Sequence, residues 1–122
     1  MQARRFLQAA WLALGLLLAL PAFAADFPAP KSGTWVVRDF KFQNGQVLPE
    51  LKVFYQTVGE PTGQPVLVLH GTTGSSNSML SPAFAGELFG AGQPLDASKY
   101  YIILPDAIGT GRSSKPSDGM RM

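Results

Sequence analysis

The chain opens on an apolar run bounded by charge on one side and by proline on the other. Two arginines precede the run Ala9–Leu20, and Pro21 follows it. Ala22-Phe23-Ala24 then has the small-x-small form of a signal-peptidase site. This pattern predicts an export signal over residues 1–24, cut after Ala24, and therefore a periplasmic or secreted protein with no stable membrane anchor.

An uncleaved anchor is the alternative for the same segment. Phe6–Ala25 holds 20 mostly apolar residues, which is near the number that spans a bilayer. Pro21 and the cleavage site favour removal of the signal.

Beyond a linker over residues 25–33, rich in proline and small residues, the pattern becomes that of β-strands. Trp35–Phe42 is followed by Asn44-Gly45, which is typical of a two-residue hairpin turn because both residues tolerate positive φ. Pro49 interrupts the pattern, and a β-rich run resumes over Leu51–Val58. We therefore expect an antiparallel hairpin at the start of a sheet.

Two short apolar runs without a polar face follow, Val66–Leu69 and Tyr100–Leu104. Such runs are typical of strands buried on both sides in a parallel sheet. Between them, Ser81 and Pro82 stand at the cap and first position of a helix that we expect to reach Phe89. The sequence thus predicts an α/β fold over residues 34–122, an antiparallel hairpin leading into a right-handed βαβ unit.

Charge and cysteine content exclude several classes of partner. Residues 25–122 carry eight basic and eight acidic side chains, so the formal surplus of +2 belongs to the signal. We therefore expect no nucleic-acid partner. The chain has no cysteine, which excludes disulfides and thiol chemistry.

The loop His70–Ser78 is the first candidate site, because open α/β sheets place their sites beyond the carboxyl ends of the strands. Gly71 and Gly74 let the chain turn sharply and bring backbone amides close to a ligand. Acyl transfer needs such donors where negative charge develops, and Thr72 N–H is the leading candidate for an oxyanion-hole donor, with Thr73 second. An ordinary turn of Gly, Thr and Ser is the alternative.

His70 is the only histidine of the chain. It has no serine or cysteine partner in a recognisable nucleophile elbow, since no Gly-x-Ser-x-Gly occurs. We therefore expect His70 to position the loop rather than to transfer protons.

The second candidate loop, Asp106–Ser117, contains glycines but fails the tests for a phosphate loop. The third glycine of Gly-x-Gly-x-x-Gly is missing, and Lys115 is followed by Pro116 rather than by a helix start. We expect neither a cofactor nor a metal here. Ser113 has no base beside it in the sequence, so hydrogen bonding within the turn is its expected role. The residues expected to shape the site are Asp106, Gly109, Gly111 and Ser113.

Four segments together resemble the N-terminal part of an α/β-hydrolase, in the branch that includes homoserine O-acetyltransferase-like proteins. They are Leu51–Gly59, Val66–Ser75, Gly90–Tyr101 and Asp106–Ser114, and the resemblance runs from about Thr34 to the C-terminus. It implies Ser-His-Asp chemistry on a small-molecule ester or acyl substrate, with Thr72 N–H as an oxyanion donor. In the family the nucleophile, acid and histidine follow in that order. All three would come after Met122, so we expect this chain alone to be an inactive, incomplete domain.

The resemblance also bears on stability and on the alternatives. It implies that the Val66–Leu69 strand pairs with the strand before the nucleophile, so residues 25–122 should leave an apolar edge open and aggregate. An exported protein lies outside the supply of acetyl-CoA, which favours water over an acetyltransferase reaction. The other hypotheses are an O-acetyltransferase fragment, a separately encoded C-terminal half as partner, and a short exported binding protein that uses His70–Ser78 as an anion or carbonyl cradle.

Overall fold

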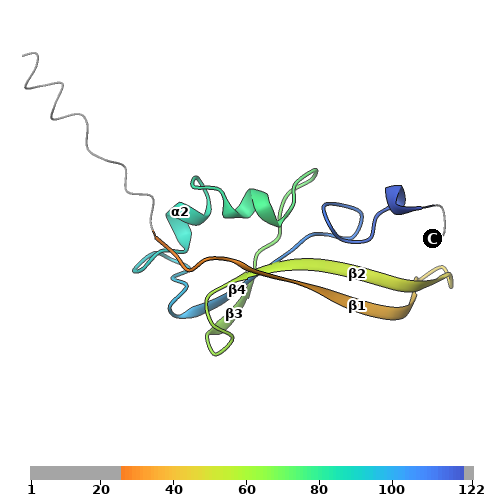
Figure 1. Ribbon diagram of the computed structural model, residues 1–122, viewed down its shortest axis with the longest axis horizontal. Helices are drawn as coiled ribbons and strands as arrows, with labels where there is room; N and C mark the ends of the chain where they lie inside the picture. The colour runs from red at the N-terminus through yellow and green to blue at the C-terminus, as the bar shows by residue number, and fades with distance from the viewer. Residues whose placement is uncertain (1–25, 120–122) are drawn as a thin grey trace, which may run out of the picture.

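The computed structural model describes residues 26–119, and the predicted export signal lies outside these residues. One sheet with strand order β1-β2-β4-β3 forms the body of this part (Figure 1). Its strands are β1 (Lys31–Lys41), β2 (Val47–Val58), β3 (Gln64–Leu67) and β4 (Tyr100–Pro105). Its helical turns are η1 (Ser76–Leu80), α2 (Ala85–Leu88) and η2 (Pro116–Asp118). The predicted α/β class, a hairpin followed by a βαβ unit, is confirmed.

The hairpin of β1 and β2 has a longer first strand and a longer loop than the sequence predicted. β1 pairs with β2 in antiparallel register, and it begins at Lys31, so the last three residues of the predicted linker belong to the sheet. Phe42 N–H donates to Gln46 O (2.8 Å) and Gly45 N–H donates to Phe42 O (2.9 Å). Of the loop residues only Gly45 has positive φ, at 88°. The expected two-residue turn is therefore wrong, because a three-residue loop needs a single left-handed residue.

Pro49 does not interrupt β2, contrary to the prediction. The pairs Arg38↔Glu50 and Phe40↔Leu48 continue the register on either side of it. Asp39, which stands opposite Pro49, has φ of 52°. β4 pairs only with the far end of β2, from Tyr55 to Val58, so the proline occupies a stretch where β2 has a strand on one side only. Such a position tolerates a residue that lacks an N–H.

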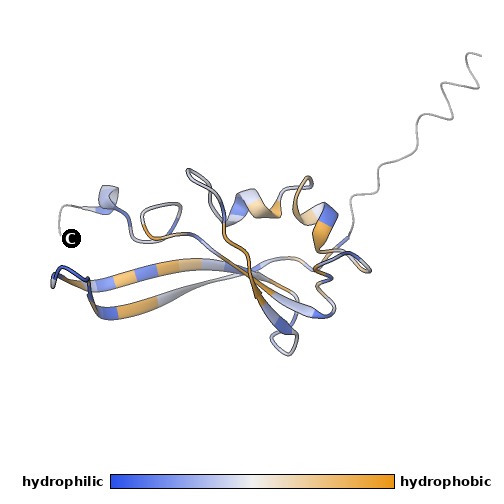
Figure 2. Ribbon diagram, turned by 180° about the vertical axis from the view of Figure 1, so that it is seen from behind, coloured by the Kyte–Doolittle hydropathy of each residue, from blue (hydrophilic) through white to orange (hydrophobic). Residues whose placement is uncertain are grey.

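The core lies between the sheet and the helical layer that covers one of its faces. Val58, Ile102 and Leu104 of the sheet are fully buried against Ala85 and Phe89 of the α2 region. In Figure 2 apolar residues gather on the strands and on the helical turns beside them. The helical layer places Asp106, at the end of β4, next to η1.

β3 and β4 are parallel, as predicted, with pairs from Gln64↔Tyr100 to Leu67↔Ile103. The expectation that both apolar runs are buried on both sides is wrong for the first of them, and in the second only Ile102 and Leu104 are fully buried. Leu67 is 61% exposed and Leu69 is 67% exposed. The physical reason is that, within residues 26–119, helices cover one face of the sheet and β3 has β4 as its only neighbour.

The helix predicted from Ser81 to Phe89 is present as a shorter element. Ser81 O accepts hydrogen bonds from Phe84 N–H (3.0 Å) and Ala85 N–H (2.8 Å), so the turn starts at the predicted residue. The regular helix covers Ala85–Leu88 only, and no side chain caps it. None of the helices within residues 26–119 is long and apolar enough to cross a bilayer.

The exposed β3 edge predicts poor solubility for a protein made of residues 25–122. Leu67 and Leu69 present apolar side chains beside unpaired strand groups, which favours edge-to-edge association. We expect the unaltered protein to elute as aggregates in size-exclusion chromatography and the double variant Leu67→Lys/Leu69→Lys to shift toward monomer. A soluble monomer of the unaltered protein with a cooperative thermal transition would contradict this prediction.

Candidate functional site

The two candidate loops start side by side at the carboxyl ends of β3 and β4. Val68 N–H donates to Ile103 O (2.9 Å), which extends the parallel pairing beyond the end of β3. His70 then reaches the second loop, where its Nε2 accepts a hydrogen bond from Ala107 N–H (3.0 Å). The sequence-based expectation that both loops lie at one edge of the sheet is confirmed.

The contacts of His70 define its tautomer. A backbone N–H can only donate, so the Nε2 that meets Ala107 N–H carries no hydrogen. Nδ1 therefore carries the ring hydrogen and donates it to Gly71 O (2.8 Å). Thr110 Oγ1 lies 3.4 Å from Nε2, but its hydroxyl donates to Ala107 O (3.1 Å). His70 thus fastens one loop to the other, the positioning role that the sequence favoured.

The turn Gly71–Gly74 carries the candidate oxyanion donors. Gly74 N–H donates to Gly71 O (3.0 Å), and Thr73 has φ of 65°. This is the form of a type II turn, in which the second central residue is left-handed. Among residues 26–119 no hydrogen bond engages the amides of Thr72 or Thr73. Both N–H groups are therefore available to a ligand.

Thr73, rather than a glycine, makes the sharp turn of this loop. A β-branched residue with positive φ is an outlier that costs on the order of 1–3 kcal/mol. Gly71 and Gly74, which the sequence analysis expected to make the turn, have no positive φ. Gly74 is needed for space, because a Cβ there would lie 3.0 Å from Ser78 Oγ, whereas Gly71 faces open space. Gly71 begins the turn without a left-handed φ, and its expected part in bringing amides close to a ligand stays a prediction.

Asp106 is a buried carboxylate that joins the second loop to η1. Its side chain is 2% exposed. Oδ1 accepts Ser76 N–H (2.6 Å) and Oδ2 accepts Arg112 N–H (2.8 Å). Burial raises the pKa of Asp106, but the hydrogen bonds from Arg112 and Ser76 outweigh it and hold that pKa below its ordinary value. The carboxylate therefore stays charged and acts as a cross-link.

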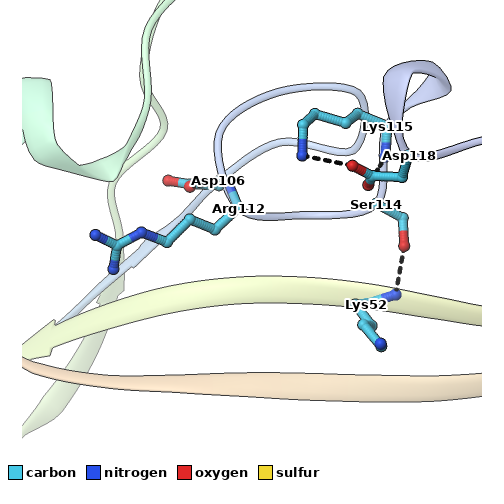
Figure 3. Close-up of polar contacts among 6 residues, drawn as sticks. All are labelled: Lys52, Asp106, Arg112, Ser114, Lys115 and Asp118. Atoms are coloured by element: carbon cyan, nitrogen blue, oxygen red, sulfur yellow. Dashed lines mark hydrogen bonds and ion pairs between the residues drawn. The ribbon is translucent and has the colours of Figure 1, made fainter.

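Ser113 and Ser114 attach the second loop to β2. Ser113 Oγ donates to Asp106 O (2.7 Å) and accepts Phe54 N–H (2.9 Å), and Ser114 Oγ accepts Lys52 N–H (2.9 Å; Figure 3). The serines thus continue the hydrogen bonding of β2 beyond its pairing with β4. Sequence analysis predicted bonding within the turn for Ser113, and the bond to Asp106 is of that kind, but the bond to β2 was missed.

The glycines of the second loop have different environments. Gly109 and Gly111 both have positive φ, at 96° and 56°. A Cβ on Gly111 would overlap the carboxylate of Asp106, whereas a Cβ on Gly109 meets nothing within 4 Å. Arg112 turns its guanidinium over the ring of Phe54, 4.8 Å from the centroid, and so covers the buried base of the loop.

Sequence analysis missed the residues that hold η1 in place. Gln56 of β2 donates from Nε2 to Ser76 Oγ (2.9 Å) and to Asn77 Oδ1 (2.6 Å). The one available signal was a polar glutamine inside the β-rich run Leu51–Val58. Within the described part of the chain, no three acidic or histidine side chains gather where they could hold a metal ion.

The chain resembles homoserine O-acetyltransferases in sequence. It is 36% identical over 96 residues to the homoserine O-acetyltransferase of Haloferax prahovense, a match that covers 68% of this chain and 23% of that protein. It is 29% identical over 120 residues to that of Thermobifida fusca, covering 75% of this chain and 32% of that protein. The chain thus spans roughly a quarter to a third of these relatives. No family model matches it.

Solved structures give the same fold. The acetyl esterase MekB aligns with a TM-score of 0.61 and 26% identity, over 73% of this chain and 25% of that one. Homoserine O-acetyltransferase from Staphylococcus aureus aligns with a TM-score of 0.58 and 20% identity, over 77% of this chain and 30% of that one. The chain has the N-terminal part of an α/β-hydrolase fold of the homoserine O-acetyltransferase-like branch. The resemblance to this branch that the sequence motifs indicated is confirmed.

The two loop glycines of this hydrolase part form a matched pair for testing the Asp106 cross-link. Gly111→Ala must displace the carboxylate, so we expect it to lower the free energy of unfolding by about 1–3 kcal/mol more than Gly109→Ala. Gly111, with φ of 56°, lies in the left-handed region that alanine tolerates better than the 96° of Gly109, so a larger loss at position 111 reports the clash and not the backbone. Urea unfolding in the Leu67→Lys/Leu69→Lys background measures it. Equal losses would contradict the assignment.

The lowered pKa of Asp106 predicts a loss of stability in acid. Stability from this carboxylate is complete above the unfolded pKa of about 4 and disappears as pH falls through the lower folded pKa. Asp106→Asn should lose about 1–3 kcal/mol at neutral pH, because one buried amide loses its acceptor, and should show a flatter acid limb. Asp118→Asn, on an exposed ion pair with Lys115, is the control and should change little at neutral pH. Unfolding in the same soluble background, followed from neutral to acid pH, decides between them.

Proposed function

We propose that this chain is the N-terminal portion of an exported α/β-hydrolase that acts in acyl transfer, with hydrolysis of an ester as the favoured reaction. The observation that carries the proposal is the Thr72 N–H, which has no partner within residues 26–119 on a turn that His70 fastens to the second loop. A donor held in this way needs no rearrangement when charge develops on a carbonyl oxygen, and this is the requirement for an oxyanion hole.

The acyl acceptor follows from location and from the relatives together. An export signal over residues 1–24 would carry the protein away from cytoplasmic acetyl-CoA and leave water as the abundant acceptor. The resemblance to an acetyl esterase supports ester hydrolysis, and the resemblance to homoserine O-acetyltransferases supports acyl chemistry in general. The substrate class is therefore a small-molecule ester.

The nucleophile must come from outside the described residues. No serine among residues 26–119 is hydrogen-bonded to His70. The hydroxyls of Ser113 and Ser114 are engaged with β2 and the loop. The open side of β3 offers the place where a further parallel strand would join the sheet, either from the same protein or from a separately encoded half. The exposed Leu67 and Leu69 at this edge argue against a self-sufficient binding protein.

A proline at position 72 tests the oxyanion donor in the complete enzyme, that is, this chain together with the segment that supplies the nucleophile. Thr72 is the first central residue of a type II turn, a position that accepts proline, so Thr72→Pro removes the N–H with little distortion. We expect kcat for a p-nitrophenyl ester to fall roughly 10²–10³-fold, with a small change in KM.

The control is Thr72→Ala, which keeps the N–H and should retain most of the activity. Equal losses in Thr72→Pro and Thr72→Ala would show that the side chain, not the amide, is used. The 122-residue chain is assayed beside them and should not turn over the ester. A rate in this chain that disappears when one of its serines is changed would overturn the claim that the nucleophile lies elsewhere.

A further inference from the structure

Gln56 is the residue of β2 that reaches across to η1. Its side chain is half-buried, and its Nε2 donates to Ser76 Oγ (2.9 Å) and to Asn77 Oδ1 (2.6 Å). Ser76 is 1% exposed, and within residues 26–119 its hydroxyl has Gln56 as its only hydrogen-bond partner. In the part of the chain that the structure describes, no other hydrogen bond joins β2 to η1. Gln56 therefore holds η1 against the sheet.

η1 follows the turn that carries Thr72 without an intervening linker. Gly74 closes the turn by donating its N–H to Gly71 O (3.0 Å), and Ser75 is already the N-cap residue of η1. Ser78 Oγ of η1 accepts Ser75 N–H (3.2 Å), and a Cβ on Gly74 would lie 3.0 Å from the same oxygen. A displacement of η1 is therefore passed on to the turn, because no spare residue separates the two.

The turn is held at both of its ends. His70 fastens its start to the second loop through Ala107 N–H. Ser76 fastens its end, because Ser76 N–H donates to Asp106 Oδ1 (2.6 Å) and Ser76 Oγ accepts from Gln56. The bonds to Ala107 and Asp106 tie the turn to the second loop, whereas the bond to Gln56 ties it to β2. Since β2 lies between β1 and β4, Gln56 connects the turn to an interior strand, which holds a site more precisely than a loop does.

We propose that Gln56 is a positioning residue for the reaction, because its bonds to Ser76 and Asn77 set the place of the Thr72 N–H. The inference rests on the proposed function, and it adds a residue of β2 that acts through the backbone of η1. An oxyanion donor is effective only where it meets the charge that develops in the transition state. A misplacement of about 1 Å lowers a rate by as much as about 10²-fold. Gln56 therefore acts on kcat rather than on substrate binding.

The test measures kcat and KM for a p-nitrophenyl ester in the complete enzyme, that is, this chain together with the segment that supplies the nucleophile. Gln56→Met keeps the length of the side chain and removes both hydrogen bonds, so we expect kcat to fall about 10–10²-fold with KM nearly unchanged.

The matched control is Gln93→Met. Gln93 is also a half-buried glutamine with two hydrogen bonds, because its Nε2 donates to Gly86 O (2.8 Å) and its Oε1 accepts Gly90 N–H (2.7 Å) in the loop after α2. Gln93→Met should lower the melting temperature about as much as Gln56→Met and leave kcat unchanged. Equal losses of kcat in the two variants would show a purely structural role for Gln56 and would overturn the inference, as would an unchanged kcat in Gln56→Met.

A double-mutant cycle separates this inference from the proposed function. In the Thr72→Pro background, which lacks the amide, Gln56→Met should lower kcat by no more than about two-fold, because both changes remove the same interaction. Losses that multiply would show that Gln56 acts on another part of the enzyme and would overturn the inference alone. An unchanged kcat in Thr72→Pro by itself would instead overturn the oxyanion donor of the proposed function.

Asn77→Ala tests the same link from an exposed position and leaves the sheet untouched. It removes one of the two acceptors of Gln56, so we expect kcat to fall less than in Gln56→Met, again with KM nearly unchanged. An unchanged kcat in Asn77→Ala would overturn the inference even if Gln56→Met gives no folded enzyme.

Discussion

The geometry of the candidate site depends on one buried carboxylate. Asp106 lies at the end of β4, and its two oxygens accept hydrogen bonds from two different amides, that of Ser76 in η1 and that of Arg112 in the second loop. Both loops that leave the sheet are therefore anchored to one charged group. Amide donors make this charge tolerable in a buried position, since a carboxylate without them would take up a proton. The hydrogen bond between His70 and Ala107, and the contacts of Ser113 and Ser114 with β2, add to the arrangement that Asp106 holds together.

The sequence allowed the main features of this arrangement to be predicted because they depend on local rules. Apolar runs predicted the parallel pairing of β3 and β4, and the strand-end rule placed His70 and Asp106 at one edge of the sheet. Thr72 became a candidate from its place after His-Gly, and its role stays a prediction. These inferences need only chain order and the direction of strands.

The failures have a common physical origin in contacts between distant residues. Gln56 and Ser76 are 20 residues apart, and Ser113 is 59 residues from Phe54, so no local pattern announces either bond. A break in the strand at Pro49 was predicted from the general preference of proline. At this position, however, β2 pairs with a strand on one side only, so no N–H is needed toward the other side. Thr73 is the opposite case, because turn chemistry favours glycine at a left-handed position and a threonine occupies it. The predicted burial of β3 was too high for a related reason. Apolar side chains show that a strand can be buried, but they do not show which neighbouring elements are there to bury it.

The bond between His70 and Ala107 has a consequence for the chemistry of the histidine. Nε2 holds the second loop only as a bare lone pair. A hydrogen on that atom would point at another N–H, and the two loops would repel each other where they now attract. His70 therefore cannot relay protons through Nε2 and hold the loops together at the same time. His70 therefore has a structural role here, and proton transfer in an enzyme built on this frame needs a group other than His70 Nε2.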